Sequence, residues 1–109
     1  MIIKNIEIDK QIFDQINLDP GGVIVTSKGK NCDFVSRYFT PQSSILEDPV
    51  TGSSHCSLTP FWAKRLKKES LIANQISKRG GSLKCFNNGK RVIIGGKAKI
   101  YFIGKIQLD

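Results

Sequence analysis

The residues with the clearest chemical potential form one short segment, EDPVTGSS at residues 47–54. A glycine and three hydroxyl residues ahead of an apolar run are typical of a turn that enters a helix. The first backbone N–H groups of such a helix have no partner within it, and its positive dipole end attracts anions. The segment therefore predicts a binding site for a small carboxylate at Thr51, Gly52, Ser53 and Ser54.

Asp48 lies immediately ahead of these groups and has a carboxylate of its own. It could hold a protonated amine or take part in proton transfer, and Pro49 restricts the backbone that carries it. A simpler interpretation is that Asp48, Thr51 and Ser53 only cap the helix. Glu47 is expected to belong to the surface charge of the protein and not to the chemistry.

The histidine and the cysteines do not indicate a catalytic or metal site. His55 is the only histidine and is expected to pack or to form a hydrogen bond within the fold. Adjacent residues of a helix point about 100° apart, so His55 and Cys56 do not form a catalytic pair. Cys32, Cys56 and Cys85 match neither a disulfide framework nor a CxxC pattern, and they are expected to be buried thiols. No cofactor motif is present, and no cofactor or metal is expected.

Length and composition indicate one ordinary globular domain over residues 1–109. The chain has 39% hydrophobic and 24% charged residues, and its net charge is +8. The basic residues concentrate after residue 60, but they are scattered over predicted strands without the exposed aromatics of single-strand binders, so nucleic acid is not the favoured partner. The apolar stretches are too short to span a bilayer, and no secretory leader pattern is visible. We therefore expect no membrane contact and a cytoplasmic location.

The N-terminal half of the sequence predicts a short helix and a hairpin. Ile12, Phe13 and Ile16 have the spacing of an amphipathic helix, which the DPGG at residues 19–22 would end. Residues 23–27 and 34–39 are rich in β-branched and aromatic residues, and the segment 28–31 between them contains a glycine. These two stretches are expected to pair as antiparallel strands.

The second half predicts a buried helix followed by strands. Residues 52–67 are apolar around most of the helix, so Cys56, Phe61, Trp62 and Leu66 are expected to be buried. Extended stretches follow at 71–77, 82–86, 91–94 and 97–108, with an Asn88-Gly89 hairpin turn between two of them. The predicted class is α+β, with a curled antiparallel sheet of about six strands wrapped around one central buried helix.

The glycine pair Gly80-Gly81 is expected to form a turn or bulge with positive φ. Arg79 precedes it and is expected to be either simply exposed or facing a substrate.

Three stretches together resemble one known family. They are DFVSRYFTP at residues 33–41, EDPVTGSSHC at 47–56 and QISKRGG at 75–81. In the same order, the C-terminal half of the phenazine biosynthesis PhzF family has patterns like D-F-V-S-R-F-F-x-P, E-D-P-V-T-G-S-A-H-C and Q-x-S-x-R-G-G. The chain is therefore similar to the C-terminal half of a PhzF-like protein.

The resemblance implies a fold and a chemistry. The fold is that of diaminopimelate epimerase, in which two similar halves each wrap a sheet around a central helix and the active site lies between them. The implied reaction is isomerisation by proton transfer at a carbon next to a carboxylate, without a metal or organic cofactor. The Asp and Ser of the family's E-D-P-V-T-G-S segment are functional, and they fall on Asp48 and Ser53.

Nothing in the sequence corresponds to the N-terminal half of that family, which supplies a general acid/base Glu and an active-site His. Three interpretations follow: the chain acts with a separate N-terminal half, two copies form a homodimer with both Asp48 loops facing one cleft, or a domain without catalytic activity binds nucleic acid or another anion through its basic surface. The first two predict a small carboxylate-bearing metabolite as the ligand. A cleft face that lacks its counterpart also predicts a homodimer at micromolar concentration.

Overall fold

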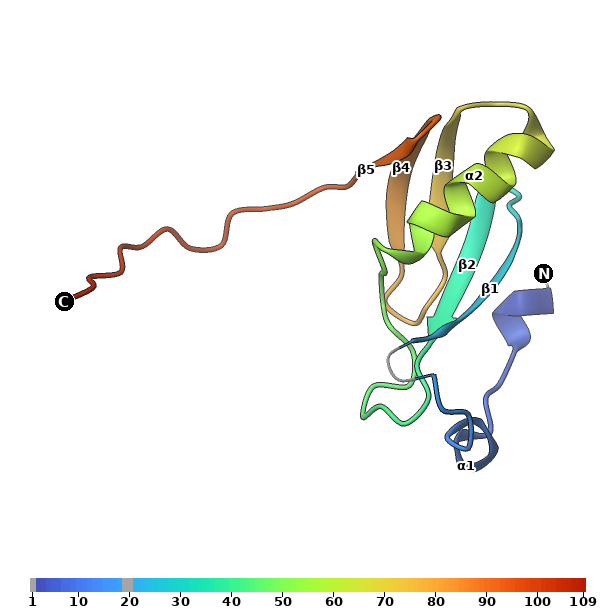
Figure 1. The fold of residues 1–109 in the computed structure, drawn as a ribbon, viewed down its shortest axis with the longest axis horizontal. Coiled ribbons are helices and arrows are strands. Elements are labelled where there is room, and N and C mark those ends of the chain that lie inside the picture. Colours follow the sequence, from blue (N-terminus) through green and yellow to red (C-terminus); the bar gives the residue numbers. More distant parts are fainter. Residues whose placement is uncertain (1, 19–20) are drawn as a thin grey trace.

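The computed structural model describes residues 2–18 and 21–109. Its elements, in chain order, are η1 (Ile2–Asn5), α1 (Lys10–Phe13), β1 (Val23–Lys28), β2 (Phe34–Phe39), α2 (Ser54–Leu66), β3 (Ser70–Gln75), β4 (Gly81–Asn88) and β5 (Arg91–Gly95). The strands form one sheet in the order β1-β2-β3-β4-β5, and α2 lies across one face of it (Figure 1). The α+β class is therefore confirmed.

The sheet is mixed, which corrects the prediction that all of its strands are antiparallel. β1 and β2 form the predicted hairpin, and β3, β4 and β5 form an antiparallel meander, but β2 and β3 run parallel. The physical reason is the connection between them. Parallel neighbours require a crossover, and α2 with its flanking loops supplies one between β2 and β3.

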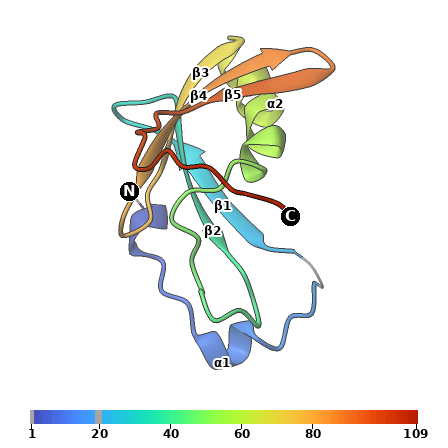
Figure 2. The same ribbon diagram turned by 90° about the vertical axis from the view of Figure 1, so that its left-hand side faces the viewer.

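The core lies between α2 and the facing side of the sheet, as Figure 2 shows from the side. Trp62 is only 9% exposed; its ring stacks on Phe34 at 6.0 Å between centroids, and its indole Nε1 donates a 2.9 Å hydrogen bond to Thr26 Oγ1. The buried cluster consists of Phe34, Leu58, Trp62, Ala63, Leu71, Ala73, Leu83 and Cys85. The predicted burial of Trp62 is confirmed, and Leu66 packs against the cluster from its edge.

Two residues predicted to be buried on this helix are exposed. Phe61 is 41% exposed and lies under the Arg65 guanidinium, and the free thiol Cys56 is also exposed. The reason is that the sheet covers only one face of α2, so apolar residues on the outer face stay in solvent. Cys85 is buried as expected, whereas Cys32 is only half-buried. The helix begins at Ser54, two residues later than predicted, and ends at Leu66 before Lys67 in the left-handed conformation (φ 54°).

The hairpin predicted at Asn88-Gly89 is confirmed between β4 and β5. Asn88 pairs with Arg91, and Gly89 takes a φ of +67°, a backbone conformation that glycine adopts without steric cost.

At the other end of the chain, the helix α1 has a single turn, and Ile12 on it is 64% exposed. The helix is therefore shorter and less buried than the spacing of its apolar residues predicted. The predicted helix stop at Asp19 and Pro20 lies outside the described residues.

The last predicted strand does not form, and the described sheet has five strands instead of about six. Residues 97–108 continue from β5 in an extended course away from the body of the molecule (Figure 1) and pair with no strand of the described chain. The alternating sequence favours a strand, but no neighbouring strand lies alongside to complete the ladder. Within the described residues, no helix has the length and apolar character needed to cross a bilayer.

Candidate functional site

The predicted site lies in the loop that leaves β2 and enters α2. Glu47 forms a single antiparallel bridge with Phe39, and the backbone N–H of Asp48 donates to the carbonyl of Tyr38 at 3.0 Å. The loop therefore follows the end of β2 before it turns toward the helix. These backbone bonds fix where Asp48 sits relative to the sheet.

Gln75, the last residue of β3, holds the loop with its side chain. Its Oε1 accepts a 2.7 Å hydrogen bond from the Thr51 backbone N–H, and its Nε2 donates to the Asp48 carbonyl at 2.9 Å and to Thr51 Oγ1 at 3.1 Å. The side chain is 1% exposed. Sequence reasoning did not assign Gln75 a role, although it begins the QISKRGG stretch quoted above. Its buried amide acts as a positioning group for both Asp48 and Thr51.

Two more residues of the same stretch attach the loop to the sheet. Ser77 Oγ donates to the Pro49 carbonyl at 2.7 Å and accepts from the Gly80 backbone N–H at 2.9 Å. A Cβ placed on Gly81 would come within 2.2 Å of Val50 Cγ2, so only glycine allows this close approach. Gly80 has the predicted positive φ (+75°); Gly81 does not, and its requirement for glycine comes from packing.

The Asp48 carboxylate is oriented by Thr51. Thr51 Oγ1 donates to Asp48 Oδ2 at 2.5 Å, and Thr51 itself is only 8% exposed. Within the described chain, no donor contacts the second carboxylate oxygen of Asp48, whose side chain is half-buried. One oxygen is therefore fixed by the protein, and the other remains available to a ligand.

The start of α2 next to Asp48 leaves backbone donors open. The N–H groups of His55 and Cys56 bond to the carbonyls of Gly52 and Ser53, but those of Gly52, Ser53 and Ser54 have no acceptor among the described residues. Ser53 occupies the cap position without a capping side-chain bond, so it does not act as the hydroxyl cap of the simpler interpretation. No heavy atom lies within 4 Å of where a Gly52 Cβ would stand, so the space beside these donors is open.

Ser54 and His55 face inward and support the loop. Ser54 Oγ donates to the Thr51 carbonyl at 3.2 Å, and His55 Nδ1 lies 2.6 Å from the same oxygen. His55 is fully buried against Phe34, and this burial lowers the pKa of its imidazole. The expected hydrogen-bonding role of His55 is therefore confirmed.

Glu47 is bound by an arginine. Its carboxylate accepts from Arg37 Nε at 2.8 Å and Nη2 at 3.0 Å, and this pairing raises the pKa of the guanidinium. Arg37 Nη1 also donates to the carbonyls of Ile3 and Ile6, at 3.0 and 2.8 Å. The pair ties the N-terminal segment to the end of β2, a structural role consistent with the expectation for Glu47.

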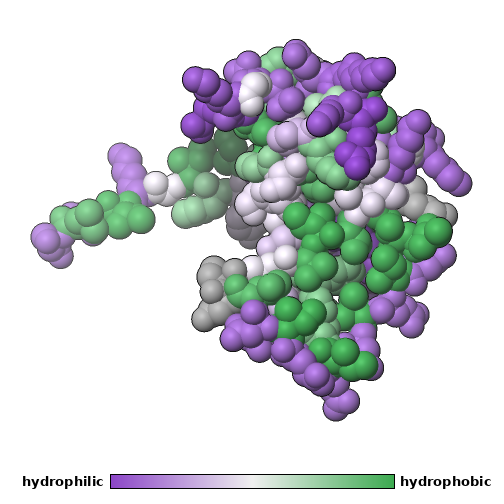
Figure 3. Space-filling view, turned by 45° about the vertical axis from the view of Figure 1, so that its right-hand side comes forward, coloured by the Kyte–Doolittle hydropathy of each residue, from purple (hydrophilic) through white to green (hydrophobic). Residues whose placement is uncertain are grey.

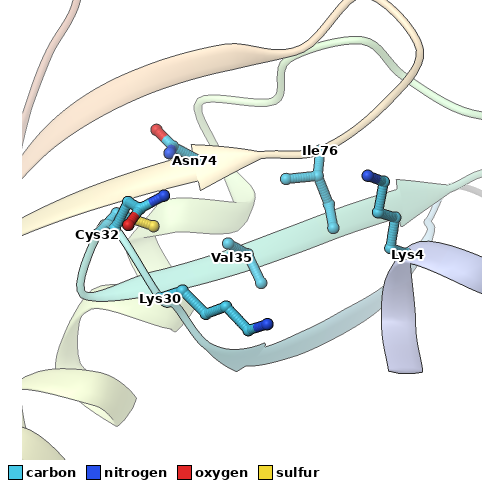
Figure 4. A pocket seen from close by; sticks show the side chains of 7 residues that line it. Lys4, Lys30, Cys32, Val35, Asn74 and Ile76 are labelled. Carbon is cyan, nitrogen blue, oxygen red and sulfur yellow. The ribbon is translucent and has the colours of Figure 1, made fainter. Parts of the chain in front are cut away.

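Two hollows lie near these elements. The first, of about 510 Å³, runs beside the loop and is lined by Glu47, Pro49, Ser77, Lys78 and Arg79. The exposed Arg79 therefore lies on the same hollow as Glu47 and Pro49, the two neighbours of Asp48. The second, of about 340 Å³, lies on the sheet face opposite α2 and has Lys4, Lys30, Cys32, Val35, Asn74 and Ile76 in its wall (Figure 4). Because neighbouring strand residues point to opposite faces, Asn74 in that wall faces away from Gln75 and the loop.

No three His, Cys, Asp or Glu side chains gather as metal ligands would in residues 2–18 and 21–109. The donors of the loop are one carboxylate, hydroxyls and backbone N–H groups. The backbone N–H groups can bind an anionic group of a ligand. Asp48 can then contact a protonated amine or an acidic C–H of the same ligand.

Comparisons with known proteins agree on one group. Residues 3–104 match the family model described as phenazine biosynthesis-like protein, PhzC-PhzF. An uncharacterized isomerase from Pseudomonas aeruginosa is 56% identical over 88 residues, which cover 81% of this chain and 34% of the relative. Another from Halalkalibacterium halodurans is 44% identical over 98 residues, 88% of this chain and 36% of the relative.

Among solved structures, a PhzF family protein from Enterococcus faecalis matches with a TM-score of 0.83 and 46% identity. That match covers 97% of this chain and 40% of the other. This chain therefore spans about a third of the length of the curated relatives it matches.

Proposed function

The chain belongs to the phenazine biosynthesis-like PhzC-PhzF family, and we propose that it forms one wall of the active site of a PhzF-like isomerase. The reaction is proton transfer at a carbon next to a carboxylate, without a cofactor. One observation carries the proposal. The Asp48 carboxylate, of which only Oδ2 accepts a hydrogen bond in the described chain, lies next to the N–H groups of Gly52, Ser53 and Ser54, which have no acceptor there.

The geometry supports a division of roles. The open amides at the start of α2 bind the substrate carboxylate, because they combine unpaired donors with the positive end of the helix dipole. Ser53 adds a hydroxyl that is exposed and makes no bond to the protein. Asp48 then lies where the neighbouring carbon or amine of the substrate would be, so it acts as one member of an acid/base pair.

The second member of that pair comes from outside this chain. Proton removal and return at carbon require a base and an acid placed against each other. The equivalent of the N-terminal half of PhzF-like proteins, which contributes a Glu in that family, completes the site and encloses α2 on its open side. The exposed Phe61 and Cys56 on the outer face of α2 are consistent with a surface that another domain covers.

Reconstitution of exchange tests this proposal. We expect the isolated chain to incorporate no solvent deuterium next to the carboxylate of candidate amino or hydroxy acids. Mixed with the N-terminal two thirds of the P. aeruginosa relative, it should exchange deuterium at that carbon, detected by mass spectrometry. Exchange by the isolated chain would show that two copies assemble a working site, and the separate half would then be unnecessary.

Binding of a small anion tests the amide site separately. We expect acetate or lactate to shift the backbone amide signals of Gly52, Ser53 and Ser54 in an NMR titration. Ser53→Ala should weaken this binding by about 1 kcal/mol, since one hydrogen bond to the ligand is lost. Ser57→Ala, at an exposed position on the same helix, is the matched control and should bind as the wild type does. Responses centred on residues 97–105 would instead favour the basic surface.

A further inference from the structure

The hollow on the sheet face opposite α2 takes no part in the proposed function. Its wall comes from Lys4 on η1, residues 30–32 of the turn between β1 and β2, Val35 on β2, and residues 74 and 76 at the end of β3. We call it the outer hollow. Its volume of about 340 Å³ is at the small end of the range of small-molecule pockets. The chemistry of its wall indicates which ligand it would accept.

The floor of the outer hollow is apolar. Val35 is only 3% exposed, and the half-buried Ile76 lies beside it across the hollow (Figure 4). The Cys32 thiol at one end donates to the Phe34 carbonyl at 3.3 Å, and burial raises the pKa of this thiol. The thiol therefore stays uncharged near neutral pH and adds no negative charge. An apolar group placed on this floor would lose contact with water, which is favourable.

Two lysines bring positive charge to the same hollow. The side chains of Lys4 and Lys30 reach in from opposite ends of it (Figure 4), and neither forms an ion pair within the described residues. No acidic residue is among the described residues that line the hollow. The nearby Asp33 is already occupied, because its two carboxylate oxygens accept from Lys68 Nζ and the Ile72 backbone N–H, each at 2.7 Å. The wall is therefore positively charged.

Exposed lysines alone mark no site in this protein. Hydrophilic side chains are spread over the face of the molecule drawn in Figure 3, and the chain has 17 lysines and arginines. The outer hollow differs because its two lysines flank a concave apolar floor, and because Asn74 adds a side-chain amide to the same wall. Polar groups around an apolar floor are typical of a small-molecule site, and here they favour a negative group on an apolar body.

Backbone hydrogen bonds hold both ends of the outer hollow in place. Arg37 Nη1 donates to the Lys4 carbonyl at 3.3 Å, so η1 is attached to the outer face of the sheet. At the other end, the Gly29 N–H donates to the Asp33 carbonyl at 3.1 Å and closes the turn that carries Lys30. The hollow therefore exists without a ligand, which lowers the free-energy cost of binding one.

We propose that the outer hollow is a binding site for a small carboxylate with an aromatic or branched apolar body. The carboxylate lies between the Lys4 and Lys30 ammonium groups, and the apolar body lies on Val35 and Ile76. A phosphate fits less well, because its three acceptor oxygens require more donors than a wall with this apolar floor offers. The site lies on the face of the sheet away from the Gln75 side chain, and it does not depend on the proposed function.

Three small probes separate the charge of the ligand from its apolar body. The full 109-residue chain is titrated with benzoate, with acetate, which lacks the ring, and with benzyl alcohol, which lacks the charge. We expect benzoate to shift the backbone amide signals of residues 32, 35, 74 and 76 and to show nuclear Overhauser contacts from its ring to the Val35 methyl groups. Benzoate should bind at least about fivefold more tightly than either other probe, because each lacks one of the two contributions.

A pair of lysine substitutions tests the positive wall. Lys4→Gln with Lys30→Gln removes both charges and should weaken benzoate binding at least about fivefold. Lys28→Gln with Lys90→Gln is the matched control, because it lowers the net charge equally at exposed lysines outside the hollow. The control should bind benzoate within about twofold of the wild type. All four substituted lysines are exposed, so both variants should keep the circular dichroism of the wild-type chain.

Four results would overturn the proposal. They are no response of the outer hollow to benzoate, equal binding of benzoate and benzyl alcohol, equal losses in the two lysine pairs, and a benzoate response confined to Gly52, Ser53 and Ser54. The last result would place benzoate at the candidate active site alone. The two sites are also tested independently, because Ser53→Ala should leave benzoate binding at the outer hollow unchanged. Binding at the outer hollow without any acetate response at the α2 amides would contradict only the proposed function.

Discussion

Asp48→Asn should reduce deuterium exchange by the reconstituted assembly at least about 100-fold, the scale of a lost general acid/base. The amide cannot accept a proton near neutral pH, whereas its oxygen can still accept the Thr51 hydroxyl that now bonds to Asp48 Oδ2. The substitution therefore removes the chemistry without removing the contact that holds the loop. Exchange is measured by mass spectrometry after incubation in deuterium oxide.

The matched control is Glu47→Gln, one residue away. Both carboxylate oxygens of Glu47 accept hydrogen bonds from Arg37, so the exchange rate of this variant should stay within about threefold of the wild type. Binding of a carboxylate to the amides at the start of α2 should survive in both variants. Equal losses of exchange in the two variants would show that the loop needs negative charge in general and would remove the specific role of Asp48.

Gln75→Leu should destabilise the fold by about 3 kcal/mol, the largest stability effect we expect from one polar side chain. Leucine fills a similar volume but leaves the Thr51 N–H and the Asp48 carbonyl without their partner in a buried place. Each unsatisfied group costs about 1 to 3 kcal/mol. The measurement is the urea midpoint of unfolding, followed by the fluorescence of the buried Trp62.

Gln11→Leu on the exposed turn of α1 is the control, and it should change the free energy of unfolding by less than about 0.5 kcal/mol. The Gln75 variant should also bind acetate more weakly at the α2 amides, because the loop that orients them is no longer attached to β3. A Gln75→Leu protein as stable as the wild type would show that the network around Thr51 is not a structural support of the site.

The sequence by itself determined the local features of this protein. The Asn88-Gly89 turn, the β1–β2 hairpin, and the presence of a helix at α2 with Trp62 buried follow from short-range rules of backbone conformation and periodicity. The three quoted stretches likewise identified the family, which the family model and the relatives confirm. Such features depend on residues a few positions apart, which is why they can be read without coordinates.

The tertiary structure alone decided how those features combine. The parallel pairing of β2 and β3 depends on the path of the crossover, and the exposure of Cys56 and Phe61 depends on which face of α2 the sheet covers. The role of Gln75 was hidden because its partners lie 24 and 27 positions away in the chain. Residues 97–108 show the same limit. Their alternation of apolar and polar residues favours a strand, but a strand forms only where a neighbouring strand edge supplies the partner for each backbone hydrogen bond.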